Sequence, residues 1–208
     1  MNKELSTPIV SPKATWGAST RASSWPRTGG IILAGSALLA VCSHVSLPLW
    51  FTPVPLTVQP FAVLLLGLLL APRLAAVTLA AYLAEGALGL PVFAPVSAAP
   101  NGLAHLLGPT GGYLIAYPLA AVLISFLWRR GGRNFSTAIL SAALGDLIIL
   151  ACGAVWLAAL THTPARSALT LAVLPFLPGD ALKTAAAAGI ACGFQRLRHR
   201  GTKSRPTS

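Results

Sequence analysis

Charge is the scarcest property of this sequence. Of its 208 residues, 9% are Asp, Glu, Lys or Arg, whereas 55% are hydrophobic. A soluble domain carries about 25% charged residues, because its surface is exposed to water. A surface this poor in charge is compatible with lipid instead. The composition excludes an ordinary soluble domain and predicts an integral membrane protein.

Acidic residues are scarcer than basic ones. The chain has 4 Asp and Glu against 15 Lys and Arg, which gives a formal net charge of +11. In a soluble protein this imbalance would indicate a nucleic-acid partner. Here the basic residues stand in the tails and in short segments between apolar runs, as in cytoplasmic loops beside anionic lipid. We therefore expect contact with the lipid bilayer and no nucleic-acid partner.

Groups that would carry catalysis are also few. The three cysteines and four histidines are scattered along the chain. Neither GxSxG nor HExxH nor a phosphate-binding glycine loop occurs. We therefore expect no enzyme activity, no metal and no cofactor.

Six apolar runs remain, each a candidate for a transmembrane helix. They predict an all-α integral membrane protein, a bundle of about six transmembrane helices with ordered outer loops. The expected domains are a flexible cytoplasmic N-terminal tail over 1–29, a substrate-binding domain over 30–197 and a basic cytoplasmic tail over 198–208. The apolar segment 167–177 is expected to fold against the outer end of the bundle. The predicted helices are 30–48, 58–71, 74–90, 112–128, 136–160 and 178–197.

The distribution of Lys and Arg predicts the orientation. If the N-terminus is cytoplasmic, Arg166 is the basic residue outside, Lys183 lies within a helix, and the other thirteen of the 15 lie inside. This asymmetry favours a multi-pass protein of the bacterial cytoplasmic (inner) membrane with both termini cytoplasmic.

The predicted outer loops are rich in Pro and Gly. They include PVPLTVQ at 53–59, GLPVFA at 89–94 and GPTGGYL at 108–114. Pro restricts the backbone and Gly permits unusual conformations, so such loops can hold a compact shape over a cavity. Long ordered loops are typically binding elements. Alternatively, Gly111 and Gly112 merely begin a helix.

Few charged residues fall within the predicted helices. Asp180 and Lys183 are three residues apart and project from one helix face. A charged pair at this depth is either a ligand site or a local helix-capping pair. Glu85 either lines the same cavity or reaches the headgroups. Asp146 is expected to hydrogen-bond a neighbouring helix, with contact to a ligand as the alternative. The small residues Ser36 and Ala40 suit close helix approach, within the bundle or to a partner.

Four segments resemble the BioY family, the biotin-binding S-components of energy-coupling factor (ECF) transporters. They are PLTVQ at 55–59, YLAEGALGLPVFA at 82–94, GPTGGYL from 108 and LPFLPGDALK at 174–183. The resemblance implies a six-helix bundle that binds biotin near the outer face and delivers it inward. It implies that Asp180 and Lys183 contact the polar head of the ligand. It assigns no role to Asn101 or His105.

The expected site and partners follow from this resemblance. Partners would be a membrane coupling subunit, docking at Ser36 and Ala40, and two ATPase subunits. The alternatives are an S-component for another vitamin, such as thiamin or riboflavin, and a small intramembrane lipid-modifying enzyme. The predicted substrate-binding residues are Asp180, Lys183, Gln59, Phe93, Tyr113, Thr110 and Glu85.

Overall fold

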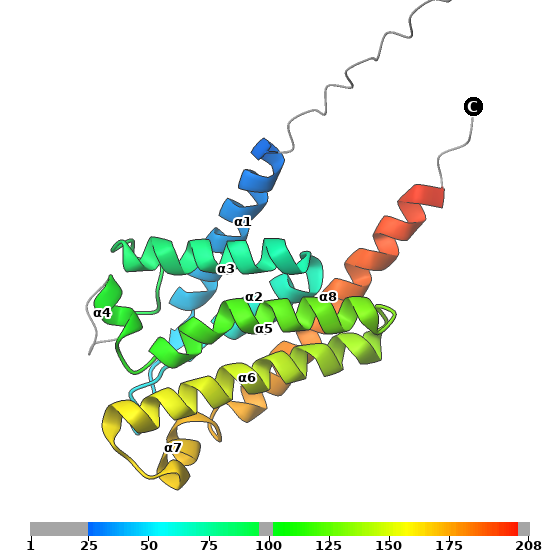
Figure 1. Ribbon diagram of the computed structural model, residues 1–208. Coiled ribbons are helices and arrows are strands. Elements are labelled where there is room, and N and C mark those ends of the chain that lie inside the picture. Colours follow the sequence, from blue (N-terminus) through cyan, green and yellow to red (C-terminus); the bar gives the residue numbers. More distant parts are fainter. Residues whose placement is uncertain (1–24, 96–101, 204–208) are drawn as a thin grey trace, which may run out of the picture.

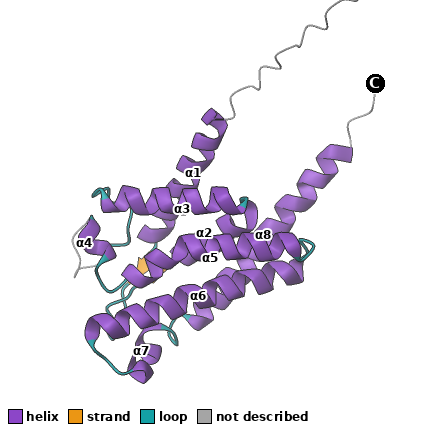
Figure 2. Ribbon diagram, viewed as in Figure 1, coloured by secondary structure: helices purple, strands orange, loops and turns teal. Residues whose placement is uncertain are grey.

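The computed structural model describes residues 25–95 and 102–203, most of which are helical (Figures 1 and 2). Two strands of two residues each, β1 and β2, pair antiparallel between α1 and α2. This architecture confirms the predicted all-α bundle. The elements are α1 (Trp25–His44), β1 (Ser46–Leu47), β2 (Leu56–Thr57), α2 (Gln59–Leu69), α3 (Pro72–Ala87), α4 (Leu103–Leu106), α5 (Gly111–Arg130), α6 (Phe135–Thr161), α7 (Ala165–Ala172) and α8 (Leu177–Lys203).

The outer surface of the bundle is apolar. Leu33, Val155 and Leu182 are 66%, 71% and 73% exposed, and each lies on a different long helix. Three described spans are long and apolar enough to cross a membrane: Pro26–His44, Gly111–Arg130 and Phe135–Thr161. Large apolar side chains that face outward are stable against lipid and not against water. The surface therefore agrees with the membrane protein predicted from composition.

The two ends of the bundle differ in their connections (Figure 1). At one end, which we call the turn end, short turns join α2 to α3 and α5 to α6. Pro72 limits the first, because the residue before a proline favours an extended backbone, and Ala71 has ψ 151°. Asn134 begins α6 with a capping box in which it exchanges hydrogen bonds with Thr137. At this end α1 also begins and α8 ends.

At the opposite end, the loop end, the β1–β2 ribbon, α4 and α7 lie over the helices (Figure 1). Side chains of the long helices bind these segments through their backbone carbonyls. The Tyr82 hydroxyl donates to Val92 at 2.8 Å, the Tyr113 hydroxyl to Ala172 at 2.7 Å and the Trp156 indole to Gly108 at 2.8 Å. These bonds confirm ordered loops among the described residues.

Close contact between α5 and α6 fixes the position of side chains at the loop end. A Cβ on Gly153 of α6 would lie 2.2 Å from the Tyr113 ring, so only glycine fits there. A Cβ on Gly112 of α5 would similarly lie 2.6 Å from the Cys152 carbonyl oxygen. Gly112 therefore packs against α6 as well as lying in the first turn of its own helix. The α5–α6 contact fixes Tyr113 at the loop end.

Several helix boundaries differ from the prediction. Helix α1 begins at Trp25, before the predicted start at 30, and the tail up to residue 24 lies outside the described residues. Helix α8 continues to Lys203, beyond the predicted end at 197. A change from apolar to basic composition marks the end of an apolar segment, but Arg and Lys are good helix formers and need not end a helix. The predicted segment at 167–177 is largely the helix α7, which packs on α6.

Candidate ligand-binding site

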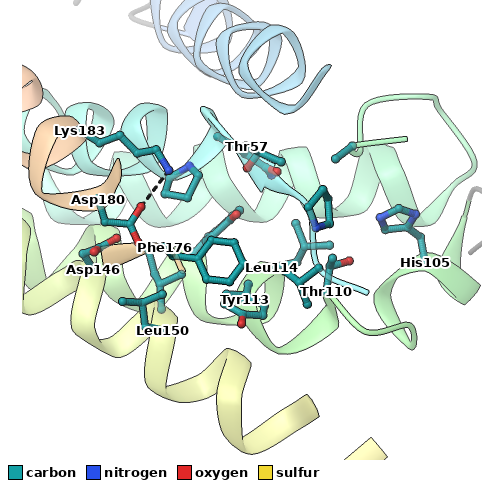
Figure 3. Close-up of a pocket in the computed structure, with 17 residues that line it drawn as sticks. Thr57, His105, Thr110, Tyr113, Leu114, Asp146, Leu150, Phe176, Asp180 and Lys183 are labelled. Atoms are coloured by element: carbon teal, nitrogen blue, oxygen red, sulfur yellow. Dashed lines mark hydrogen bonds and ion pairs between the residues drawn. The ribbon is translucent and has the colours of Figure 1, made fainter. Parts of the chain in front are cut away.

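A pocket of about 550 Å³, counting its open mouth, lies at the loop end. Several segments far apart in sequence converge on it (Figure 3). Its mainly apolar lining with a few convergent polar groups suits a small molecule. The lining residues are Val54, Pro55, Thr57, Gln59, Pro60, Ala94, His105, Thr110, Tyr113, Leu114, Tyr117, Asp146, Ile149, Leu150, Phe176, Asp180 and Lys183.

The first turns of α8 place a buried ion pair in this pocket. The Lys183 Nζ lies 2.8 Å from the Asp180 Oδ1, with side chains 13% and 5% exposed. The backbone N–H of Asp180 donates to the Phe176 carbonyl at 2.9 Å, which holds the start of the helix. A carboxylate near a helix N-terminus is also favoured by the helix dipole. The pair thus neutralises itself and still lines the pocket.

A second carboxyl group, that of Asp146 on α6, lies beside Asp180 (Figure 3). Asp146 is 6% exposed, and its Oδ1 has no hydrogen-bond partner among the described residues. The hydrogen bond to a neighbouring helix that the sequence predicted is therefore not found for this oxygen. A buried acceptor without a donor costs about 1–3 kcal/mol, which a ligand donor would recover.

Aromatic side chains form much of the apolar wall. Tyr113 and Phe176 pack with ring centroids 6.3 Å apart, and Tyr117 lies one helical turn after Tyr113. The hydroxyl of Tyr113 bonds Ala172, so the hydroxyl-bearing edge of this ring is tied to α7. The wall therefore offers flat apolar surface beside the charged pair.

Further polar side chains line the pocket. Gln59, at the start of α2, donates from Nε2 to the Tyr82 hydroxyl at 2.9 Å. Thr110 precedes α5 and makes no side-chain capping bond to it. In Figure 3, Thr110 and His105 lie toward the opposite end of the pocket from Asp180. The pocket thus has two polar ends separated by an aromatic middle.

His105 of α4 lines the pocket although the sequence assigned it no role. It is 2% exposed, stacks on Phe93 at 5.0 Å between centroids, and its Nδ1 has no partner in the described part of the chain. Burial lowers the pKa of this imidazole from its usual 6.5. His105 is therefore neutral at pH 7 and retains one donor and one acceptor nitrogen.

Two predicted ligand residues do not line the pocket. Phe93 is 4% exposed and packs between Tyr82 and His105, so it supports the lining from behind. Glu85 accepts a hydrogen bond from the Ser36 hydroxyl of α1. It lies three residues after the buried Tyr82 and faces α1 instead of the pocket. Both placements correct the prediction.

The same contact corrects the predicted docking face. Ser36 is 2% exposed, because its hydroxyl is engaged with α3. Ala40 is half-buried and packs against the core. Ser36 therefore serves contact between α1 and α3, and no docking surface can include its side chain.

Five of the seven predicted residues do converge on the pocket: Gln59, Thr110, Tyr113, Asp180 and Lys183. Among those missed, Tyr117 could have been found from its four-residue spacing after Tyr113. Phe176 lies two residues before the PGD motif. The orientation of Asp146 toward the pocket depends on the rotation of α6, which the sequence does not give. Asn101 lies outside the described residues.

A helical bundle with an apolar outer surface, and with a polar and aromatic pocket under ordered loops, has the features of a membrane protein that binds a small molecule. The comparisons place this chain within that class. A model of the BioY family matches residues 18–200, and the chain belongs to this family.

Relatives and a solved structure agree with this assignment. The probable biotin transporter BioY of Pyrococcus horikoshii is 41% identical over 155 residues, covering 74% of this chain and 88% of that protein. The biotin transporter BioY of Thermotoga maritima is 36% identical over 162 residues, covering 78% and 92%. A crystal structure of the S-component for biotin from an ECF-type ABC transporter matches with a TM-score of 0.77 and 26% identity. That match covers 84% of this chain and 94% of the solved one.

Proposed function

We propose that this protein is the biotin-binding S-component of an ECF-type vitamin transporter and takes up biotin through the loop-end pocket. The observation that carries the proposal is the polar composition at one end of the pocket. The ureido ring of biotin presents two N–H donors and one carbonyl acceptor. Asp180, Asp146 and Lys183 supply two carboxyl acceptors and one ammonium donor.

The proposed binding mode assigns one role to each group. Asp180 and Asp146 each accept from one ureido N–H, and Lys183 donates to the ureido carbonyl. Charge-assisted bonds of this kind are strong in a site screened from water. The Asp146 carboxyl keeps an acceptor oxygen whether or not it is protonated. Tyr113 and Phe176 would pack on the apolar sulfur ring.

The carboxylate tail of biotin would then lie at the other end of the pocket. Thr110 and neutral His105 can each donate a hydrogen bond there, and α5 begins at Gly111. The partial positive charge of a helix N-terminus favours an anion at that position. This arrangement supports a ligand with a neutral polar ring at one end and a carboxylate at the other.

Transport is proposed to proceed from the loop end toward the turn end. The turn end and the adjoining helix ends hold Arg73, Arg129, Arg130, Arg133 and Arg196, whereas Arg166 is the basic residue of α7. By the positive-inside rule, the turn end and both termini are cytoplasmic in the bacterial inner membrane. A membrane coupling subunit and two ATPase subunits would supply energy. Ala40 and its exposed neighbour Ala37 are the positions of α1 that we propose for docking.

Binding by the purified protein tests the function directly. Isothermal titration in detergent should detect biotin and give no heat with thiamin or riboflavin. Desthiobiotin, which keeps the ureido ring and lacks the sulfur, should bind more weakly than biotin but still measurably. Preferential binding of thiamin or riboflavin would contradict the proposal.

A further inference from the structure

A second cavity lies at the turn end, where α2, α5 and α8 meet the α5–α6 turn. Three arginines line it: Arg129 and Arg133 beside the turn, and Arg198 on α8. The biotin-binding proposal makes no use of this cavity, because the cavity shares no lining residue with the loop-end pocket.

The charge of this cavity is one-sided. The described part of the chain has three acidic residues, Glu85, Asp146 and Asp180, and none of them lines it. Glu85 binds Ser36, and the two aspartates line the loop-end pocket. Several guanidinium groups around one cavity attract an anion, and Arg binds phosphate with planar, paired donors.

Local hydrogen bonds hold two of these arginines in place. The Arg129 Nε donates to the Ser125 hydroxyl at 3.1 Å, which orients its guanidinium group. Arg133 has φ 54°, and its backbone N–H donates to the Trp128 carbonyl at 3.2 Å. The tight α5–α6 turn therefore holds both positions against the cavity.

Apart from Gln195, the remaining lining is apolar, and the cavity is open to the outside. Leu68 and Trp128 are buried at its base, whereas Phe194 of α8 is 58% exposed. A free phosphate ion would gain nothing from these side chains. A phospholipid would gain from both parts, because its phosphate meets arginine and its acyl chains meet Leu69 and Phe194. Basic pockets between helices at the cytoplasmic side are typical sites for anionic headgroups.

We propose that the turn-end cavity binds an anionic phospholipid, with Arg129 and Arg133 on the phosphate and the acyl chains along Leu69 and Phe194. The phosphate chemistry is shared by lipid headgroups and free phosphate, so the experiment has to separate the two sources. The proposal is independent of the ligand bound at the loop end.

The test is native mass spectrometry of the full chain in detergent. Phosphatidylglycerol and phosphatidylcholine with identical acyl chains are titrated separately, and inorganic phosphate forms a third arm. The variants are Arg129→Gln with Arg133→Gln, and Arg130→Gln as the matched control. Arg130 is adjacent in sequence, but it lies over the Phe126 ring at 4.6 Å and does not line the cavity.

Wild-type protein and Arg130→Gln should retain phosphatidylglycerol in preference to phosphatidylcholine. The double variant should lose this preference, with affinity for phosphatidylglycerol about tenfold weaker or more. Its melting temperature in phosphatidylcholine should match wild type; if the double variant fails to fold, Arg133→Gln alone carries the test. Equal retention by variant and wild type would overturn the site. Binding of inorganic phosphate as tight as that of phosphatidylglycerol would overturn the lipid assignment.

Discussion

The loop end and the turn end of the bundle each contain a cavity. The two cavities differ in whether their charged side chains are paired with groups of opposite charge. At the loop end, Lys183 and two aspartates converge, with Lys183 and Asp180 2.8 Å apart. At the turn end, arginines converge with no described carboxylate in the lining. A buried charged group is costly unless it is paired, whereas charges beside the headgroups can stay solvated.

The segments that connect the helices also differ between the two ends. The loop end holds its segments with buried side-chain bonds such as Tyr113 to Ala172, which position groups around a ligand. The turn end uses short capped turns that need only reverse the chain. If the two proposals hold, the loop end encloses a polar ligand beside a paired ammonium and carboxylate, and the turn end binds an anionic headgroup. Five measurements test this difference between the two ends.

The largest effect concerns which end faces outward. Single cysteines at Trp50, which is 95% exposed at the loop end, and at Gly132 in the α5–α6 turn report the two sides. In a background without the three native cysteines, an impermeant maleimide added to intact cells should label Trp50→Cys and leave Gly132→Cys unlabelled. Labelling of Gly132→Cys from outside would reverse the proposed orientation.

The next effect concerns the ion pair of α8. Asp180→Asn keeps the shape but places amide donors toward the ureido N–H groups, and Lys183→Met keeps the stem without its donor. Each variant should weaken biotin binding by about ten- to over a hundredfold, the equivalent of about 1.5–3 kcal/mol for a bond to a charged group.

Calorimetry and melting temperature are measured together for these variants. Leu182→Ile is the matched control, because Leu182 is adjacent and 73% exposed on the outer surface. If Asp180→Asn and Lys183→Met bind biotin normally and only melt earlier, the pair is a structural capping pair and the site assignment is wrong.

Replacing Asp146 should have a smaller effect on biotin binding. The direction in which the melting temperature changes distinguishes a ligand contact from a structural role. Asp146→Leu removes a buried carboxyl whose Oδ1 has no described partner. The variant should melt no lower than wild type, because a costly buried polar group is lost. It should bind biotin about five- to tenfold more weakly, since one ligand hydrogen bond is worth about 1–1.5 kcal/mol. Lower melting with unchanged affinity would identify Asp146 as a structural residue.

Tyr113→Phe tests how the loop end is held. It removes the 2.7 Å bond to Ala172 and leaves that carbonyl without its donor, at a cost of about 1–2 kcal/mol. The melting temperature should fall by about 2–6 °C. Trypsin should also cut faster at Arg166 of α7, while cleavage in the α5–α6 turn is unchanged. Equal acceleration at both sites would indicate general destabilisation and not release of α7.

The sequence predicted the features that depend on composition and short spacing. The six long helices follow from their apolar runs, and the pairing of Asp180 with Lys183 follows from a spacing of three residues on one helix. The GPTGGYL segment lies at the loop-end pocket as expected, because Thr110 precedes α5 and Tyr113 faces the core.

Features that depend on helix rotation were not predictable. Glu85 and Asp146 are both acidic residues within apolar helices, yet one faces α1 and the other faces the pocket. The choice depends on contacts between helices far apart in sequence, which no local pattern encodes. Phe93 was expected to contact the ligand and His105 was assigned no role, yet His105 of α4 lines the pocket and stacks on Phe93.

The smallest effect is the pH dependence contributed by His105. Burial lowers its pKa below the 6.5 of an exposed imidazole, so the unfolded chain binds the proton more readily than the folded one. The stability that neutral His105 contributes is therefore fully present above about pH 6.5. It is lost as the pH falls below this value, by at most about 1.4 kcal/mol per pH unit.

His105→Gln should flatten the fall in melting temperature between pH 7 and pH 5. His44→Gln, which replaces an exposed imidazole outside the pocket, is the matched control. Because Asp146, Asp180 and Lys183 are retained in both variants, a difference in slope between them isolates His105. An identical slope in the two variants would mean that His105 accepts its proton in the folded pocket without penalty, and the loop end would then tolerate a positive charge at both of its polar ends.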